Sequence, residues 1–148
     1  METGEITFPE TDKIQRVLYI LNFGRKLSEN VVSEIQQSTN ALVNEELIRV
    51  NINLSKNIYI QVVDVVNSIT SDQLNGDKKI VVNLPGLPLA AVYILVELHA
   101  RLGYFPLVLE LYRDHKKDPI FSEFSLKKIV DLERERNVTR SRIFGQQL

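Results

Sequence analysis

The feature that most constrains this fold is a pair of short, almost wholly apolar runs, each followed by a turn and a helix-like segment. The runs are Arg16–Phe23 (RVLYILNF) and Lys79–Leu84 (KIVVNL). Continuous apolarity over so short a length is typical of a strand that is buried on both faces. Such strands alternating with helices predict an α/β fold, in which a parallel sheet is covered by helices on both sides.

The rest of the chain continues this alternation. Further strands are predicted at Leu47–Leu54 and Phe105–Tyr112, and the polar face of the former favours an edge position. Helix ends are marked by serines at N-caps, by proline in a first turn and by glycine after a last turn. The predicted helices run from Ser28 to about Asn40, from a cap at Ser55 through Ile69, over Pro88–Leu102 before Gly103, and over Leu126–Arg136 with Ser125 as cap.

Together these elements predict an open parallel sheet of order 2-1-3-4, with an additional C-terminal helix. We divide the 148 residues into a flexible N-terminus (1–12), a ligand-binding domain (13–113) and a linker with a C-terminal helical extension (114–148). Residues 113–148 carry a net charge of +3, whereas residues 1–112 carry −4. A basic end suits phosphates or an acidic partner, and a solvated helix with a frayed tail is the simpler explanation.

Several classes of function are disfavoured by what the sequence lacks. It has no cysteine, two histidines and no cluster of carboxylates, so we expect neither a metal site nor a cofactor. No apolar run approaches the roughly 20 residues of a membrane span, and Met1–Asp12 is acidic and has no apolar core. We therefore expect a cytoplasmic protein without a membrane partner. The turns match neither the dinucleotide-binding fingerprint nor a Walker loop.

The candidate site lies at the switch point of the predicted sheet, at the carboxyl ends of the first and third strands, where ligands bind in such folds. The two loops there are Asn22–Ser28 and Asn83–Pro88. Each places an asparagine at the strand end and a glycine in the turn. The predicted ligand-binding residues are Asn22, Phe23, Gly24, Arg25, Lys26, Ser28, Asn83, Leu84, Pro85, Gly86 and Leu87.

The residue types in these loops fit binding better than catalysis, although asparagine and glycine are also common turn residues. An asparagine amide can donate to and accept from a ribose hydroxyl or a base edge, and glycine allows a ligand close to the backbone. Helix N-termini beside Arg25 and Lys26 suit phosphate groups. His99 is predicted toward the far end of its helix, so we assign no catalytic residue and favour a binding protein over an enzyme.

Three segments resemble the Csx-fifteen family of CRISPR-associated proteins from type III systems. Leu21–Phe23, followed by a serine-capped helix, resembles the N-terminal signature of that family. Asn83–Ala91 (NLPGLPLAA) is similar to its N-P-P-G-L-x-x-A-A segment, and Glu97–Pro106 (ELHARLGYFP) is similar to its E-L-H-G-R-x-G-x-F-P segment. The resemblance spans roughly residues 16–112 and departs from the family pattern at Leu84 and Ala100.

The resemblance implies a Rossmann-like domain related to the CARF sensors, which bind cyclic oligoadenylate, most often cyclic tetra-adenylate, in a cleft across a homodimer. It implies a protein of antiviral defence that sequesters this messenger and damps type III CRISPR signalling, with no long nucleic acid as partner. One alternative is a metal-independent ring nuclease, in which the ribose 2′-hydroxyl attacks the neighbouring phosphate and Arg25 and Ser28 assist. The other is a protein-interaction adaptor that uses the basic C-terminal segment as its contact surface.

Overall fold

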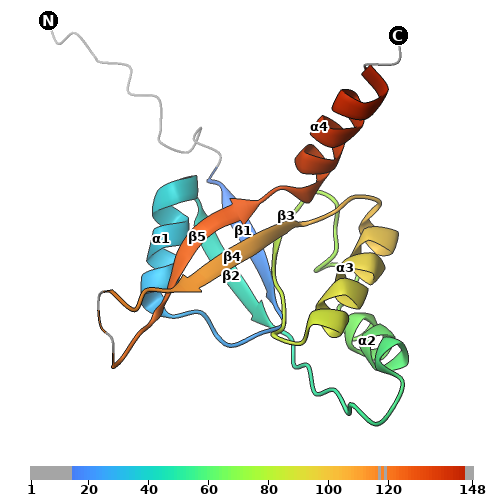
Figure 1. Ribbon diagram of the computed structural model, residues 1–148, viewed down its shortest axis with the longest axis horizontal. Coiled ribbons are helices and arrows are strands. Elements are labelled where there is room, and N and C mark those ends of the chain that lie inside the picture. The colour runs from blue at the N-terminus through green and yellow to red at the C-terminus, as the bar shows by residue number, and fades with distance from the viewer. Residues whose placement is uncertain (1–14, 117, 119, 146–148) are drawn as a thin grey trace, which may run out of the picture.

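A five-stranded sheet runs through the centre of the molecule, with helices on both of its faces (Figure 1). The computed structural model describes residues 15–116, 118 and 120–145. The strands are β1 (Val17–Asn22), β2 (Leu42–Leu47), β3 (Lys79–Asn83), β4 (Leu107–Arg113) and β5 (Phe124–Val130). The helices are α1 (Glu29–Thr39), α2 (Ile58–Asn67), α3 (Pro88–Leu102) and α4 (Leu132–Phe144). The strand order is β2-β1-β3-β4-β5, and the first four strands are parallel, which confirms the predicted Rossmann-like α/β fold and its order 2-1-3-4.

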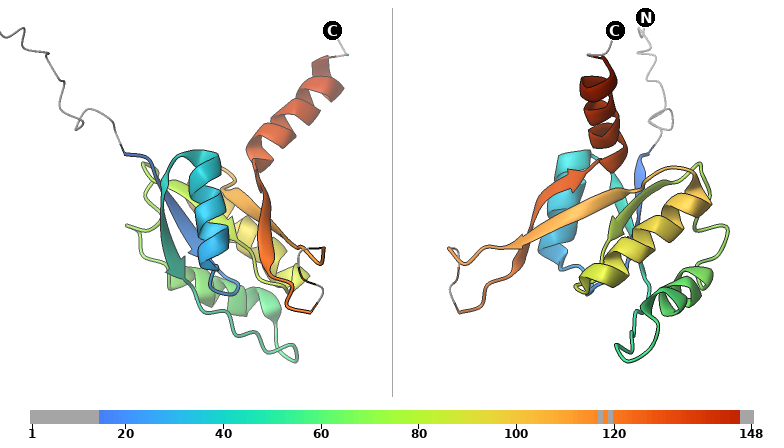
Figure 2. Two further views of the ribbon diagram at one scale, coloured as in Figure 1. Left: turned by 90° about the vertical axis from the view of Figure 1, so that its left-hand side faces the viewer. Right: turned by 45° about the vertical axis from the view of Figure 1, so that its right-hand side comes forward.

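Alternate residues of the central strands point to opposite faces of the sheet and build two cores. Leu18 and Ile20 of β1 pack with α1, whereas Leu21 packs with α2 and α3. Figure 2 shows α1 on one side of the sheet and α2 and α3 on the other. Most residues of β1 and β3 are buried because both of their faces are covered, as their apolar runs predicted. The ends of these two strands are therefore held firmly in place.

The predicted ends of the two helices that follow the central strands are confirmed. Ser28 caps α1, where its Oγ accepts a hydrogen bond from the Val31 N–H at 3.2 Å. Pro88 opens α3, and Gly103 ends it with a φ of 82°, a left-handed conformation that favours glycine. Both helices that follow the predicted site loops thus begin where the sequence placed them.

The prediction of a strand over residues 47–54 is wrong, because β2 lies earlier in the chain. Residues 48–54 alternate in burial since Ile48, Val50 and Ile52 pack against the core beneath α2 and α3. The Ile48 N–H still donates to the Asn22 carbonyl at 2.8 Å, and beyond it the segment is a loop lying over the sheet end. The alternation of apolar and polar residues in this segment therefore comes from a loop that packs on the core with one side, and not from a strand paired in the sheet.

The helix predicted over residues 126–136, with Ser125 as its cap, is also wrong. Residues Phe124–Val130 form β5, which pairs antiparallel with β4 and extends the sheet. Leu126 and Ile129 pack against the core on the α1 side. Their spacing also suits a helix, but a strand can bury them while satisfying the open edge of β4.

The predicted C-terminal helix exists as α4, displaced toward the C-terminus. Asp131 caps it by accepting from the Arg134 N–H at 3.0 Å. Likewise Asn57, rather than Ser55, caps α2, because Ser55 bonds to the Asn53 side chain instead. Figure 2 shows α4 standing away from the sheet, and none of its residues is buried.

The segment after β4 therefore completes the sheet before it forms α4. The domain boundary expected at residue 113 falls within the hairpin that joins β4 and β5. Residues 1–12, expected to be flexible, lie outside the described part of the chain. Among the described residues, no helix combines the length and the apolarity needed to cross a bilayer.

Candidate functional site

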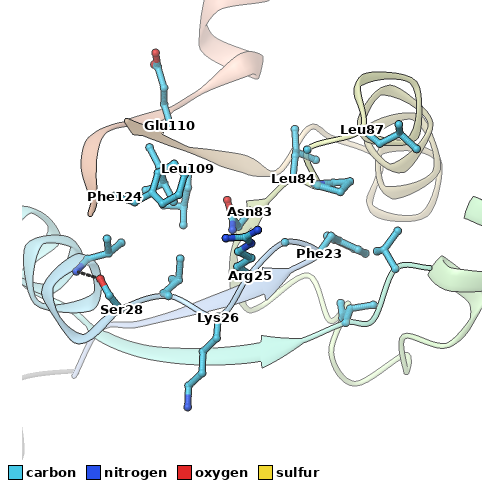
Figure 3. Close-up of a pocket in the computed structure, with 18 of the residues that line it drawn as sticks. Phe23, Arg25, Lys26, Ser28, Asn83, Leu84, Leu87, Leu109, Glu110 and Phe124 are labelled. Atoms are coloured by element: carbon cyan, nitrogen blue, oxygen red, sulfur yellow. Dashed lines mark hydrogen bonds between the residues drawn. The ribbon is translucent and has the colours of Figure 1, made fainter. Parts of the chain in front are cut away.

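A cavity of about 1210 Å³ opens at the carboxyl ends of β1 and β3 (Figure 3). Its walls come from the loops after β1, β2 and β3 and from the β4–β5 hairpin. Ligand sites in proteins commonly enclose about 300–1,000 Å³, so this space can hold more than a mononucleotide. The cavity lies at the switch point of the sheet, where the topology predicts a site.

All of the predicted site residues except Asn22 line this cavity. They are Phe23, Gly24, Arg25, Lys26, Ser28, Asn83, Leu84, Pro85, Gly86 and Leu87. The two loops lie side by side because Asn22 and Asn83 occupy neighbouring positions in the register of β1 and β3. Whether these residues bind a ligand stays a prediction.

Asn22 lies beneath the cavity, where its side chain joins the two loops by hydrogen bonds. Its side chain is fully buried, and its Oδ1 accepts from the Gly24 N–H at 2.8 Å and from Asn83 Nδ2 at 2.9 Å. Its Nδ2 donates to the Arg25 carbonyl and to Glu45 Oε2, both at 2.7 Å. These four bonds use the whole capacity of an asparagine amide. Asn22 therefore positions the loop and has no group left for a ligand.

Glu45, on β2, fastens the same loop from the other side. Its Oε2 accepts from Asn22 Nδ2 and also from the Leu27 N–H at 3.0 Å. A carboxylate that accepts two hydrogen bonds at once makes stronger bonds than a neutral acceptor would. The turn between β1 and α1 is thus fixed before any ligand arrives, which lowers the ordering cost of binding.

Asn83 is the asparagine that can reach a ligand. Its Nδ2 donates to Asn22, and its Oδ1 has no hydrogen-bond partner among the described residues. The residue is partly exposed and lines the cavity, and Figure 3 shows it near the centre of the view. Asn83 therefore offers a free acceptor held in a fixed orientation.

The cavity wall carries more positive than negative charge. Arg25, Lys26, Arg49 and Arg113 line it, against Glu110 and Glu123. Glu110 is neutralised in part by Lys127, whose Nζ lies 3.3 Å from Glu110 Oε1. Arg25, Lys26 and Arg49 make no ion pair within the described residues, so they are available to an anion.

The start of α3 places the positive end of a helix dipole next to the cavity. α3 starts at Pro88, directly after the lining residue Leu87, and no side chain caps it. Because Pro88 has no N–H, the first free N–H groups belong to Leu89 and Ala90, which follow the lining residues rather than line the cavity themselves. Uncapped N–H groups at a helix start carry partial positive charge and bind phosphate or carboxylate oxygens. The apolar side chains of Phe23, Leu84 and Leu87 form the adjoining wall.

Several lining residues were not predicted from the sequence. Arg113, Glu123 and Phe124 enter the cavity because β5 folds back along β4, and Arg49 enters because residues 48–54 form a loop. Phe124 was missed because the apolar residues just after it, Leu126 and Ile129, also fit the spacing of a helix, so no hairpin was predicted there. Glu45 was missed because no local sequence feature indicates that a side chain on β2 bonds to the loop after β1.

His99 lies outside the cavity, toward the other end of α3, as its position in the helix predicted. Its ring centroid is 4.3 Å from that of Phe105, and its Nε2 is 3.9 Å from Glu133 Oε1. The cavity lining contains no histidine. In the described part of the chain, no group of three or more histidine, cysteine or acidic residues is placed to hold a metal ion.

The two loop glycines are expected to respond differently to alanine. A Cβ on Gly24 would lie 3.1 Å from Asn83 Nδ2 and 3.3 Å from the Leu84 carbonyl, so Gly24→Ala should strain the Asn22–Asn83 bond and destabilise the fold by about 1–2 kcal/mol. Gly86 has no neighbour within 4 Å of an added Cβ, so Gly86→Ala should leave stability unchanged or raise it by up to about 1 kcal/mol. Thermal unfolding of both variants checks this, and equal losses would contradict it.

Comparisons of this chain with protein-family models, with curated proteins and with solved structures found no match.

Proposed function

We propose that this protein binds a cyclic oligoadenylate, most simply cyclic tetra-adenylate, and sequesters it, thereby damping type III CRISPR signalling. The observation that carries the proposal is the switch-point cavity itself. It combines unpaired cations, one free amide acceptor and apolar walls within about 1210 Å³, beside the uncapped start of α3. This combination suits a ligand that alternates phosphates, ribose hydroxyls and flat bases.

Each part of such a ligand has a counterpart in the wall. Phosphodiester oxygens suit Arg25 and Lys26, and the positive end of the α3 dipole lies next to the same cavity. A ribose hydroxyl or an adenine amino group can donate to Asn83 Oδ1. The bases can lie against apolar side chains such as Phe23 and Leu84. The segments that resemble motifs of the Csx-fifteen family support the same class of ligand.

The homodimer that this proposal requires has a suitable surface on α3. Leu89, Val92 and Val96 form an exposed apolar stripe along that helix, 47%, 55% and 51% exposed. The stripe contains no charge, so a second copy can pack on it across a twofold axis with like residues facing one another. The stripe begins at Leu89, two residues after Leu87 of the cavity. If the twofold axis runs along the stripe, the cavities of the two copies would therefore open near one another.

Ring cleavage is the second candidate function. A 2′-hydroxyl can attack the neighbouring phosphate without a protein nucleophile, provided that the ring is oriented and the charge is stabilised. Arg25 lies unpaired on the same wall as Ser28, whose Oγ accepts from Val31 and still carries its own proton. These two residues would stabilise the phosphate and position the ribose.

Calorimetric titration of the full chain with cyclic tri-, tetra- and hexa-adenylate, followed by chromatography of the recovered ligand, tests the proposal. We expect one ring to bind tightly and to be recovered intact. Linear products appearing over many turnovers would establish the ring nuclease instead. No heat and no thermal shift with any ring would overturn both readings and favour a protein-interaction adaptor.

Arg25→Ala is expected to weaken cyclic tetra-adenylate binding about tenfold or more, because it removes a charge-assisted contact to phosphate. The affinity of this variant should also fall less steeply than that of the wild type as salt is added, because one salt-screened charge contact is lost. Lys79→Ala is the matched control, since Lys79 is an exposed cation at the opposite end of β3 from Asn83. If Arg25→Ala binds the ring as tightly as Lys79→Ala does, Arg25 is not part of the binding site.

A further inference from the structure

We infer that the β4–β5 hairpin carries a stacking subsite for a nucleobase, formed by Phe124 and Arg113. This inference rests on the proposed function and names how part of the ligand is held. Phe124 is 41% exposed although it is a large apolar residue, and it lines the cavity. An aromatic ring left open at the wall of a ligand cavity is suited to receive a flat partner.

The guanidinium of Arg113 lies over one face of that ring. The two residues are partners in the antiparallel register of β4 and β5, and the guanidinium carbon lies 4.9 Å from the centroid of Phe124. Arg113 also lines the cavity and makes no ion pair among the residues that the structure describes. The pair therefore presents a flat guanidinium and an aromatic ring together.

A base can use both parts of this pair. Nucleobases stack on aromatic side chains and on arginine planes, and such stacking tolerates different sequences because every base has a π-face. A phosphate alone would need the cation but not the ring. Figure 3 shows Phe124 and Leu109 on one side of the cavity and Leu87 on the other, with Arg25 and Asn83 between them in this view.

The absence of tryptophan from this chain gives a direct optical test. Phe124→Trp places a single indole in the subsite, and its fluorescence should be quenched when AMP or cyclic tetra-adenylate stacks on it. Tyr112→Trp is the matched control, because Tyr112 is also an aromatic residue, 41% exposed, on the same hairpin but does not line the cavity. Ribose 5-phosphate, which has no base, should quench neither variant.

Calorimetry with two further variants completes the test. Phe124→Leu keeps an apolar side chain but removes the aromatic ring, and Arg113→Lys keeps the positive charge but removes the planar guanidinium. Each should lower cyclic tetra-adenylate affinity by about tenfold, while Tyr112→Leu leaves it unchanged. If the wild type binds the ring while Phe124→Leu binds equally well and Phe124→Trp shows no quenching, the subsite is wrong although the proposed function stands. If AMP quenches Phe124→Trp but no ring binds the wild type, the subsite stands and the proposed function falls.

Discussion

Asn22→Asp is expected to lower the free energy of unfolding by roughly 3 kcal/mol at neutral pH, although the two side chains have nearly the same shape. The change keeps Oδ1, which accepts from Gly24 and Asn83, but it replaces the donor Nδ2 with an oxygen. That oxygen would face the Arg25 carbonyl and Glu45 Oε2, each 2.7 Å away in a buried setting. In a chain of this size, the melting temperature should fall by about 6–12 °C.

The loss should depend on pH in a defined direction. A carboxyl placed against Glu45 has its pKa raised above the unfolded value of about 3.9, because two carboxylates in contact resist a second negative charge. The folded variant then binds a proton more tightly than the unfolded chain. Its stability relative to the wild type is therefore regained as pH falls toward that unfolded value, and it is lost as pH rises through the raised pKa.

Asn30→Asp supplies the matched control for this experiment. Asn30 Nδ2 also donates to a glutamate, Glu34 Oε1 at 2.9 Å, but Asn30 is exposed, and the other oxygen of Glu34 keeps its bond from the Leu126 N–H at 2.8 Å. There the same substitution should change stability by no more than about 0.5 kcal/mol. Thermal unfolding of both variants and the wild type at about pH 4.5 and about pH 7.5 gives the comparison. Equal, pH-independent losses for both variants would show that Asn22 does not hold the loops as described.

The central part of the fold and both site loops could be predicted because their signals are local. The apolar runs of β1 and β3 record burial on two faces, and each run ends in an asparagine at the same level of the sheet. The switch point then follows from the strand order alone. Pro88 and Gly103 mark the ends of α3 by conformational preferences that need no tertiary context.

The edges of the sheet could not be predicted in this way, because tertiary contacts decide them. Two exposed lysines interrupt β5, and its apolar residues fit helical spacing, so the open edge of β4 settles its conformation. An irregularity between Glu110 and Leu111 further breaks the alternation that would reveal the pairing. Likewise, the role of Asn22 could not be read from its type, since only the position of Glu45 shows that its amide is fully used.

Val92→Asp is expected to convert the proposed homodimer to monomers and to weaken cyclic tetra-adenylate binding about tenfold or more. Val92 lies in the middle of the exposed apolar stripe of α3, and a twofold axis would bury a new carboxylate from each copy without a partner. Val138→Asp is the control, because Val138 is similarly exposed, at 50%, but lies on α4. Sedimentation velocity and calorimetry on both variants give the two readouts.

Ligand and partner must act on each other if one ring spans two copies. Linkage is reciprocal, so the factor by which dimerisation tightens ring binding is also the factor by which the ring tightens the dimer. Sedimentation of the wild type with and without the ring should therefore show a stronger dimer with it, at one ring per two chains, whereas Val92→Asp should show a much smaller response. A ring that binds one to one and leaves the association unchanged would mean that each cavity is complete within a single chain, and the stripe on α3 would then have no part in recognition.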